Sequence, residues 1–556
     1  MNLLCGLLLL LQAPAATTLP PKPTAKPAVE RVIERNAFTF TEYRLQATLD
    51  PAKHGLSVEG DVTLRNDSDK SQDNATLQIS SSLEWKAITA AGATASYAAA
   101  RIVSDVDHTG AVSEACVTIS PVAPKGSITL HVAYAGTVEL GSGRLRRLGT
   151  PQTIAEQNDW DRIGADIIAL RGVGYITWYP VSIEPALLSD GNTVFERIAQ
   201  WRGRHQQSSM TLTLRGTTGT VVSSADQASS DETIQTWRNF GIDTPTFVIA
   251  AYQRSATRNG DVFGLQGSTD TAQRYAKLFD ELQPIADARP RNPQRVAQLP
   301  ASFSAFEAKN LLVTPFSDRT SDAVVKFNLL HTAAHAYFVS ERPWLNEGFA
   351  HWAQLRSVNH ASGRKAALAM LQDRESGLAL ADSSEHDPQP LTSAYDEIFY
   401  RTKATYVWWM LADMVGDDKL LAAIRAYVPA QDREPSYFQR LVEKESGKGM
   451  EQFFDDWVYR DKGLPEFKIT DFYSRQNLNG GMMVTVTIEN SGTAGAEVPI
   501  TAHAKDVENS ARVWVPAKSK ASARIVMPLL PNDVVVNDGG VPEIDPTDNV
   551  YTVAPK

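Results

Sequence analysis

The stretch HTAAHAYFVSERPWLNEGFA, residues 331–350, decides how this chain is interpreted. The helical spacing around it predicts a helix with His331 and His335 one turn apart on the same face. That helix is expected to break before Pro343, and a second helix can return Glu347 toward the histidines. Two imidazoles and a carboxylate, with water at the fourth position, are the ligands of a catalytic zinc ion. The stretch therefore predicts a Zn²⁺ site formed by His331, His335 and Glu347.

The histidine pair is weak evidence by itself. The chain has ten histidines among 556 residues, and two of them can simply pack a helix. The segment WLNEGFA, residues 344–350, is more specific, and the second helix is expected to begin in it near Asn346. This segment resembles the third-ligand segment of the aminopeptidase N family of gluzincin zinc metallopeptidases.

Weaker motifs, in the family's order, extend this resemblance over residues 38 to about 545. SAFEA, residues 304–308, stands where the family has Gly-Ala-Met-Glu-Asn, so the resemblance implies that Glu307 holds the free amine of a peptide. Lys-Ala-Thr at 403–405 looks like part of the family's Tyr-x-Lys-Gly-Ala helix, and residues 453–465 are similar to the family's junction with its third domain. The resemblance implies an N-terminal β saddle or sandwich, a thermolysin-like domain and an Ig-like end.

Departures from the family pattern concern the catalytic groups. The family's general base is a Glu directly after the first histidine, and here that residue is Thr332, whose hydroxyl is not ionised at neutral pH. The carbonyl-polarising Tyr of the family is expected where this chain has Arg401, and the neighbouring Tyr400 can replace it only after a shift of one residue. Eleven residues separate His335 from Glu347, fewer than in typical members, which does not by itself prevent ligation.

A displaced carboxylate can replace the missing base, and Glu341 and Glu307 are the candidates. The alternative is that Glu341 is a solvated loop charge and Glu307 a charge at a strand edge. His351 lies one turn after Glu347 on the same helix face. It can therefore be a further metal ligand or a neighbour of the ligands. The alternative is that it is a packing or surface residue.

Hydrophobic periodicity divides the chain into three folded parts. Apolar residues alternate with period two in the first and last parts, whereas the middle part has helical spacing. The fold class is therefore multidomain α+β. The predicted parts are an N-terminal antiparallel β domain at 38–225, a thermolysin-like, mainly helical domain at 226–464 and a C-terminal Ig-like β-sandwich at 465–556.

The N-terminus predicts export. An apolar run from Leu3 to Leu11 is followed by Ala13-Pro14-Ala15, a small-residue cleavage pattern, so residues 1–16 are expected to be a signal peptide and 17–37 a Pro-rich linker. An uncleaved anchor is the alternative. The expected location is the periplasm or the exterior of a bacterial cell, with no transmembrane segment after the signal peptide.

The net charge of −10 and the lack of any Lys/Arg cluster argue against nucleic-acid binding and leave a peptide or protein as the expected partner. Three interpretations remain open. The chain is a zinc-binding peptidase homologue impaired by Thr332, an active zinc aminopeptidase with a relocated base, or a structural or binding protein without metal.

Overall fold

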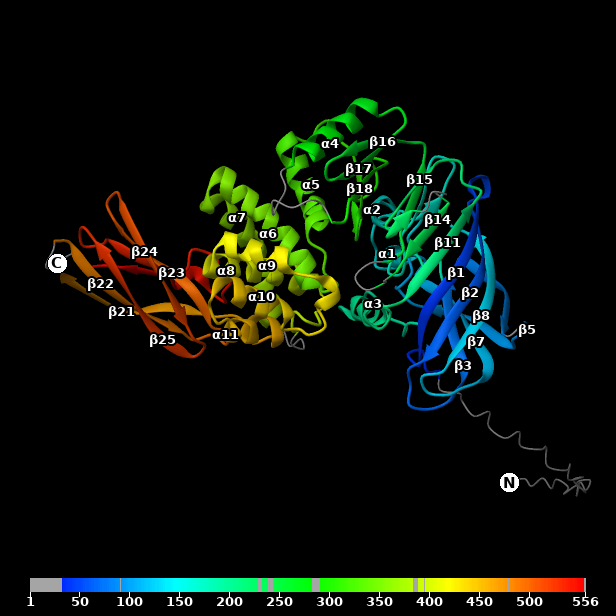
Figure 1. The fold of residues 1–556 in the computed structure, drawn as a ribbon, viewed down its shortest axis with the longest axis horizontal. Coiled ribbons are helices and arrows are strands. Elements are labelled where there is room, and N and C mark those ends of the chain that lie inside the picture. Colours follow the sequence, from blue (N-terminus) through cyan, green and yellow to red (C-terminus); the bar gives the residue numbers. More distant parts are fainter. Residues whose placement is uncertain are drawn as a thin grey trace, which may run out of the picture.

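The computed structural model describes residues 33–554 apart from 91, 229–232, 239, 241–243, 283–290, 384–388, 395 and 478–479. Its elements form a β-rich N-terminal region, a middle region with most of the helices and a β-rich C-terminal region (Figure 1). This order confirms the predicted multidomain α+β class. The predicted signal peptide lies outside the described residues, as does the predicted linker up to residue 32. Among the described helices, none is both long and apolar enough to cross a membrane.

The N-terminal region is built from strands whose apolar residues alternate, so that each strand buries one face. An eight-stranded sheet has the order β13-β14-β11-β1-β2-β8-β4-β5, and a three-stranded sheet has the order β3-β7-β6. Their bounds are β1 Phe38–Asp50, β2 Gly55–Asn66, β3 Gln72–Ser80, β4 Leu83–Ala90, β5 Ala93–Thr94, β6 Tyr97–Val103, β7 Ala111–Val122, β8 Ser127–Thr137, β11 Ser209–Arg215, β13 Gln227–Ala228 and β14 Ile234–Trp237.

Two features of this region differ from the expectation. The strands β1 and β11 pair in parallel, because the chain between them is long enough to return to the same end of the sheet. The antiparallel pairing of β11 with β14 carries the eight-stranded sheet to Trp237, past the predicted domain end at residue 225.

A four-stranded sheet of order β12-β15-β10-β9 follows, with three helices nearby in the sequence. The strands are β9 Arg162–Ile163, β10 Ile168–Leu170, β12 Thr220–Ser223 and β15 Phe247–Ala250, and the helices are α1 Gly143–Arg147, α2 Gln152–Asn158 and α3 Thr193–Arg204.

The middle region combines a five-stranded sheet of order β16-β17-β18-β20-β19 with a bundle of helices (Figure 1). The strand β19 forms one edge and is antiparallel to β20. The strands are β16 Tyr252–Thr257, β17 Gly260–Leu265, β18 Gln294–Leu299, β19 Phe306–Ala308 and β20 Leu311–Pro315. The helices are α4 Thr269–Glu281, α5 Asp322–Tyr337, α6 Pro343–Ser362, α7 Arg364–Ser383, α8 Ala404–Val415, α9 Asp417–Ala426, α10 Tyr437–Ser446 and α11 Glu451–Phe454, with π-helical turns at Ile398–Lys403 and Asp455–Tyr459.

The C-terminal region is a sandwich of two sheets, β21-β22-β25 and β24-β23-β26-β27. Its core is continuous with that of the helices, and the indole of Trp457 donates a hydrogen bond to the carbonyl of Gly495 across the junction at 2.8 Å. The strands are β21 Phe467–Gln476, β22 Met482–Asn490, β23 Ala496–Ala504, β24 Val507–Val515, β25 Ser519–Met527, β26 Asp533–Val536 and β27 Val550–Thr552.

Candidate metal centre

The helix α5 presents the two predicted histidine ligands together. Ser321 caps its N-terminus and Asp322 complements the helix dipole in its first turn. Its last two turns are buried, and His331 and His335 are 9% and 3% exposed. Their Nε2 atoms lie 3.4 Å apart, as one helical turn allows.

The helix α6 returns the predicted third ligand. It begins at Pro343, three residues earlier than expected, because the fixed φ of proline suits the first turn of a helix. Glu347 is buried, with Oε2 3.6 Å from Nε2 of His331 and Oε1 3.8 Å from Nε2 of His335. The next residue, Gly348, lies so close to α8 that a Cβ would come within 2.4 Å of the Trp408 ring. This contact holds α6 against α8.

These three residues fit a zinc ion. Tetrahedral ligands at zinc distances of about 2.0–2.1 Å are roughly 3.3 Å from one another. The two Nε2 atoms are 3.4 Å apart, and Glu347 approaches the histidines with different oxygens, Oε2 at 3.6 Å from His331 and Oε1 at 3.8 Å from His335. The Nδ1 atoms of His331 and His335 are buried without a hydrogen-bond partner among the described residues, while the Nε2 atoms converge. His331, His335 and Glu347 would hold the ion, which would supply a Lewis acid there.

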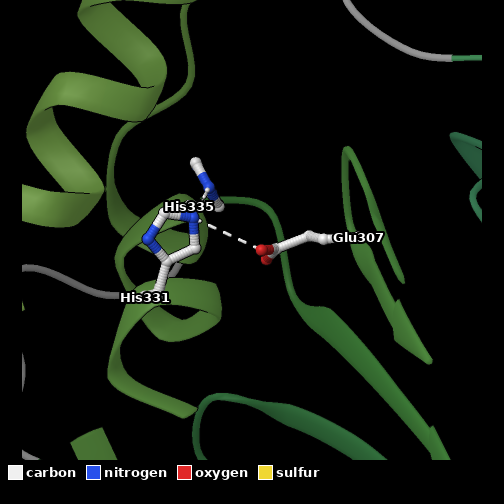
Figure 2. Close-up of side chains that lie close together, drawn as sticks. All are labelled: Glu307, His331 and His335. Carbon is white, nitrogen blue, oxygen red and sulfur yellow. Dashed lines mark hydrogen bonds and ion pairs between the residues drawn. The ribbon is translucent and has the colours of Figure 1, made fainter. Parts of the chain in front are cut away.

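A second carboxylate lies at the same place. Glu307 comes from the edge strand β19, and its Oε2 atom lies 3.3 Å from Nε2 of His331 (Figure 2). Its other oxygen, Oε1, accepts a hydrogen bond of 2.8 Å from the hydroxyl of Thr332. Thr332 therefore contacts Glu307, at the position where the resemblance implies a general base.

The π-helical turn at Ile398–Lys403 decides which side chain reaches the ligands. Arg401 Nε donates to Oε2 of Glu347 at 3.1 Å, and its Nη1 lies 3.3 Å from Glu397. Tyr400 instead donates its hydroxyl to Glu397 at 3.3 Å. A guanidinium thus contacts the third ligand in the place where the resemblance implies a phenol.

The two remaining candidates, His351 and Glu341, lie in different surroundings. The ring of His351 packs against that of His331 with 4.5 Å between centroids, and a metal could be reached by one atom each of His331, Glu347 and His351, because these atoms lie within 4.8 Å of one another. His351 Nδ1 is also 3.1 Å from Oε1 of Gln354. Glu341 is exposed on the segment between α5 and α6, unlike the buried ligands.

Electrostatics within the group follow from burial and from the nearby charges. Burial lowers the pKa of His331, but the carboxylates of Glu307 and Glu347 outweigh it, so the net shift is upward. Burial dominates at His335, whose pKa is lowered. Burial would raise the pKa of Glu347, but Arg401 and His331 hold it well below its usual range. The group therefore favours an ionised Glu347 beside Arg401.

Residues of the N-terminal region hold the strand that carries Glu307, a contact that the sequence analysis did not predict. The amide of Ser304 donates to the carbonyl of Gln157, and the indole of Trp160 donates to the carbonyl of Ser304, both at 2.9 Å. The ring of Phe306 packs edge-on against Tyr175 with centroids 5.1 Å apart. The aromatic residues and the Asn-Asp-Trp-Asp run at 158–161 are the only signals of this contact, and neither has a specific spacing.

Comparison with known proteins supports the family. Residues 338–457, which include Glu347 and Arg401 but not the two histidines, match the Peptidase family M1 domain. The Tricorn protease-interacting factor F2 of Thermoplasma volcanium is 25% identical over 229 residues, which cover 36% of this chain and 29% of that protein. These matches support the predicted resemblance to the aminopeptidase N family, peptidase family M1.

A solved structure also matches over much of its length. It is the crystal structure of an M1 zinc metallopeptidase from Deinococcus radiodurans, an E323A mutant bound to a Tyr-Ser-Ala substrate. The match covers 76% of this chain and 94% of that chain, with a TM-score of 0.45 and 18% identity.

Proposed function

We propose that this member of the M1 peptidase family is an exported protein that binds zinc and a peptide or protein but is catalytically impaired. The observation that carries the proposal is the 2.8 Å hydrogen bond from the Thr332 hydroxyl to Glu307. The position expected to accept a proton from water is occupied by a hydrogen-bond donor. The converging ligand atoms of His331, His335 and Glu347 support zinc binding.

The size of the expected defect follows from the missing base. General acid–base catalysis contributes about 10²–10⁴-fold to a rate, or roughly 3–5 kcal/mol of barrier. The hydroxyl of Thr332 can orient a neighbour but cannot take up a proton at neutral pH. Export is proposed from the apolar run at 3–11 and the small residues that follow it.

An active zinc peptidase is the second candidate, and one observation favours it. The carboxylate of Glu307 lies at the ligands, 3.3 Å from Nε2 of His331, where a relocated base would have to be. Under this interpretation the chain has chelator-sensitive peptidase activity that Glu307→Gln abolishes. A protein without metal, the third interpretation, would keep its folding and its ligand binding in a His331→Ala, His335→Ala variant.

The first test is the zinc content of protein purified without added metal. We expect about one zinc per chain, none in His335→Ala and an unchanged content in His360→Ala, whose side chain is 56% exposed on the same helix as Glu347. With aminoacyl and peptide substrates, the unaltered chain is expected to show little turnover. A robust chelator-sensitive activity that is lost in His331→Ala would contradict the proposal.

A further inference from the structure

We infer that Glu307 is a fourth protein ligand of the zinc ion, so that the site is closed to water rather than open. This inference rests on the zinc binding proposed above. The family resemblance implies that this residue holds a peptide amine, whereas the geometry brings its carboxylate to the histidines.

The distances support ligation. The separation of 3.3 Å between Glu307 Oε2 and His331 Nε2 is shorter than either distance from Glu347 to a histidine. It also equals the roughly 3.3 Å expected between two ligand atoms of a tetrahedral zinc ion. One atom each of Glu307, His331 and His335 lie within 4.8 Å of one another. Figure 2 shows the carboxylate of Glu307 pointing toward the two histidines.

Thr332 orients this carboxylate. Because its hydroxyl donates to Oε1 of Glu307, the other oxygen is left facing His331. Metal-binding carboxylates are commonly held by such hydrogen bonds from neighbouring groups. A glutamate at position 332 would instead set a second negative charge against Glu307 and push it away. Thr332 therefore explains both features of the site: the family's general base is missing, and Glu307 can approach the metal ligands.

Charge and backbone anchoring also favour the arrangement. Two carboxylates in one buried site repel each other, and the guanidinium of Arg401 offsets that repulsion because it acts on both Glu347 and Glu307. The strand β19 is fixed by the hydrogen bonds of Ser304 to Gln157 and Trp160. Glu307 is therefore held near the two histidines by a strand that follows Ser304, a residue hydrogen-bonded to the N-terminal region.

The consequence is a site of the closed kind. Structural zinc sites are four-coordinate with protein ligands only, whereas catalytic sites keep one position for water or substrate. Four ligands from His331, His335, Glu347 and Glu307 would make the ion a stabilising element that joins α5, α6 and β19.

Cobalt substitution tests whether Glu307 is a ligand, because the visible spectrum of bound Co²⁺ changes when water replaces a carboxylate ligand. We expect the full chain loaded with Co²⁺ to show intense absorption, and Glu307→Ala to show a changed spectrum and a zinc Kd at least tenfold higher in chelator competition. The matched control Glu341→Ala removes an exposed glutamate between α5 and α6, and it should leave both measurements unchanged.

Thr332 provides a second variant that keeps every ligand. Thr332→Val removes the orienting hydroxyl and is expected to raise the zinc Kd about 10- to 100-fold, while Thr332→Ser restores it. A Kd within twofold of the unaltered chain and an unchanged Co²⁺ spectrum in Glu307→Ala would overturn the inference while leaving the proposed zinc binding intact. A chain that takes up no metal at all would overturn both.

Discussion

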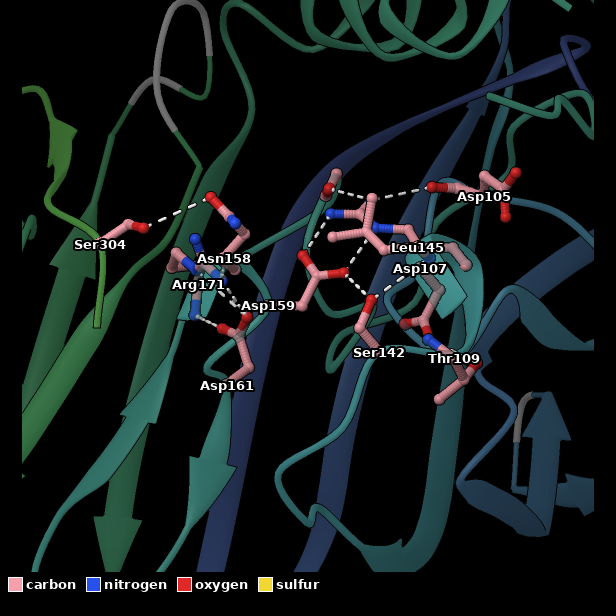
Figure 3. Close-up of polar contacts among 12 residues, drawn as sticks. Asp105, Asp107, Thr109, Ser142, Leu145, Asn158, Asp159, Asp161, Arg171 and Ser304 are labelled. Carbon is pink, nitrogen blue, oxygen red and sulfur yellow. Dashed lines mark hydrogen bonds and ion pairs between the residues drawn. The ribbon is translucent and has the colours of Figure 1, made fainter. Parts of the chain in front are cut away.

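Two buried groups of charged residues in this molecule are built on opposite principles. In the N-terminal region the buried carboxylates of Asp159 and Asp161 each have a guanidinium of their own (Figure 3). At the ends of α5 and α6, two carboxylates and two histidine rings share the single guanidinium of Arg401. The first group is complete in itself, whereas in the second group carboxylate oxygens and imidazole nitrogens lie within 4 Å of one another around His331 and His335. This difference supports the proposal that the second group binds a metal.

In the N-terminal group, each of the two arginines donates two hydrogen bonds to one aspartate. Arg144 binds both oxygens of Asp159, at 2.7 and 2.9 Å. Arg171 Nε and Nη2 donate to Oδ2 of Asp161 at 3.1 and 2.7 Å. Its guanidinium carbon also lies 3.8 Å from the ring centroids of both Trp160 and Tyr175. These contacts stabilise the segment that holds β19.

The largest expected effect comes from breaking this complete group. Arg171→Met keeps the volume of the side chain but leaves the carboxylate of Asp161, which is 0% exposed, without its partner. Removing one partner of a buried pair costs about 3–5 kcal/mol, so we expect the apparent Tm to fall by roughly 10 °C. The zinc content per folded chain should stay near one, because no ligand is removed.

The matched control is Arg44→Met. Arg44 pairs with Glu42 on an exposed face of the same region, with 68% of its side chain accessible. Exposed pairs contribute about 0–1 kcal/mol, so the apparent Tm should hardly change. If Arg171→Met unfolded no more easily than this control, the N-terminal group would not be the self-sufficient element that the comparison assumes.

The same contrast explains how much the sequence could predict. The sequence could place His331 and His335 together because helical spacing is local and fixes which side chains share a face, whereas Glu347 was predicted from the WLNEGFA segment that follows. The approach of Glu307 depends on an edge strand that the N-terminal region holds in place, and no local pattern encodes such a contact. The alternation of apolar residues likewise predicted the two β-rich ends, but not the parallel pairing of β1 with β11.

Arg401 shows a different limit. A π-helical turn carries one extra residue, so the choice between Tyr400 and Arg401 depends on a backbone irregularity that periodicity does not reveal. The sequence could name both residues but could not decide between them.

A buried carboxylate of the C-terminal region, which accepts hydrogen bonds from amides, sharpens the comparison. Glu543 is 0% exposed, and its Oε1 atom accepts hydrogen bonds from the amides of Asn537 and Asn549 at 2.6 and 2.5 Å. Burial raises its pKa to about 8. Because the folded state then binds more protons than the unfolded state, stability from this group is present below about pH 4.5 and is lost as the pH rises to 8. We expect a loss of about 2–4 kcal/mol over that range.

The measurement is the difference in urea denaturation between the unaltered chain and Glu543→Gln, from pH 4.5 to 8.5. The variant cannot ionise, so its stability relative to the unaltered chain should rise with pH. Glu508→Gln, at a side chain that is 75% exposed, is the control and should show no such trend. If the difference in unfolding free energy between the two proteins did not change with pH, the amide donors alone would keep this buried carboxylate ionised. A buried carboxylate would then need neither a guanidinium nor a metal, which contradicts the comparison.

The smallest expected effect concerns Arg401 and tests whether its guanidinium competes with zinc. Because Glu347 offsets one of the two charges of zinc, the repulsion from Arg401 is about that of two unit charges ~5 Å apart, roughly 3 kcal/mol at an effective dielectric constant of 20. Loss of the hydrogen bond to Glu347 costs about 10- to 100-fold in affinity, which is the smaller term. Arg401→Met should therefore bind zinc about tenfold more tightly in chelator competition, while Arg401→Lys, which keeps the charge, should stay close to the unaltered chain. Weaker binding by Arg401→Met would instead show that the guanidinium acts mainly by orienting Glu347, as Arg171 orients Asp161, and the two groups would then differ less than their charges suggest.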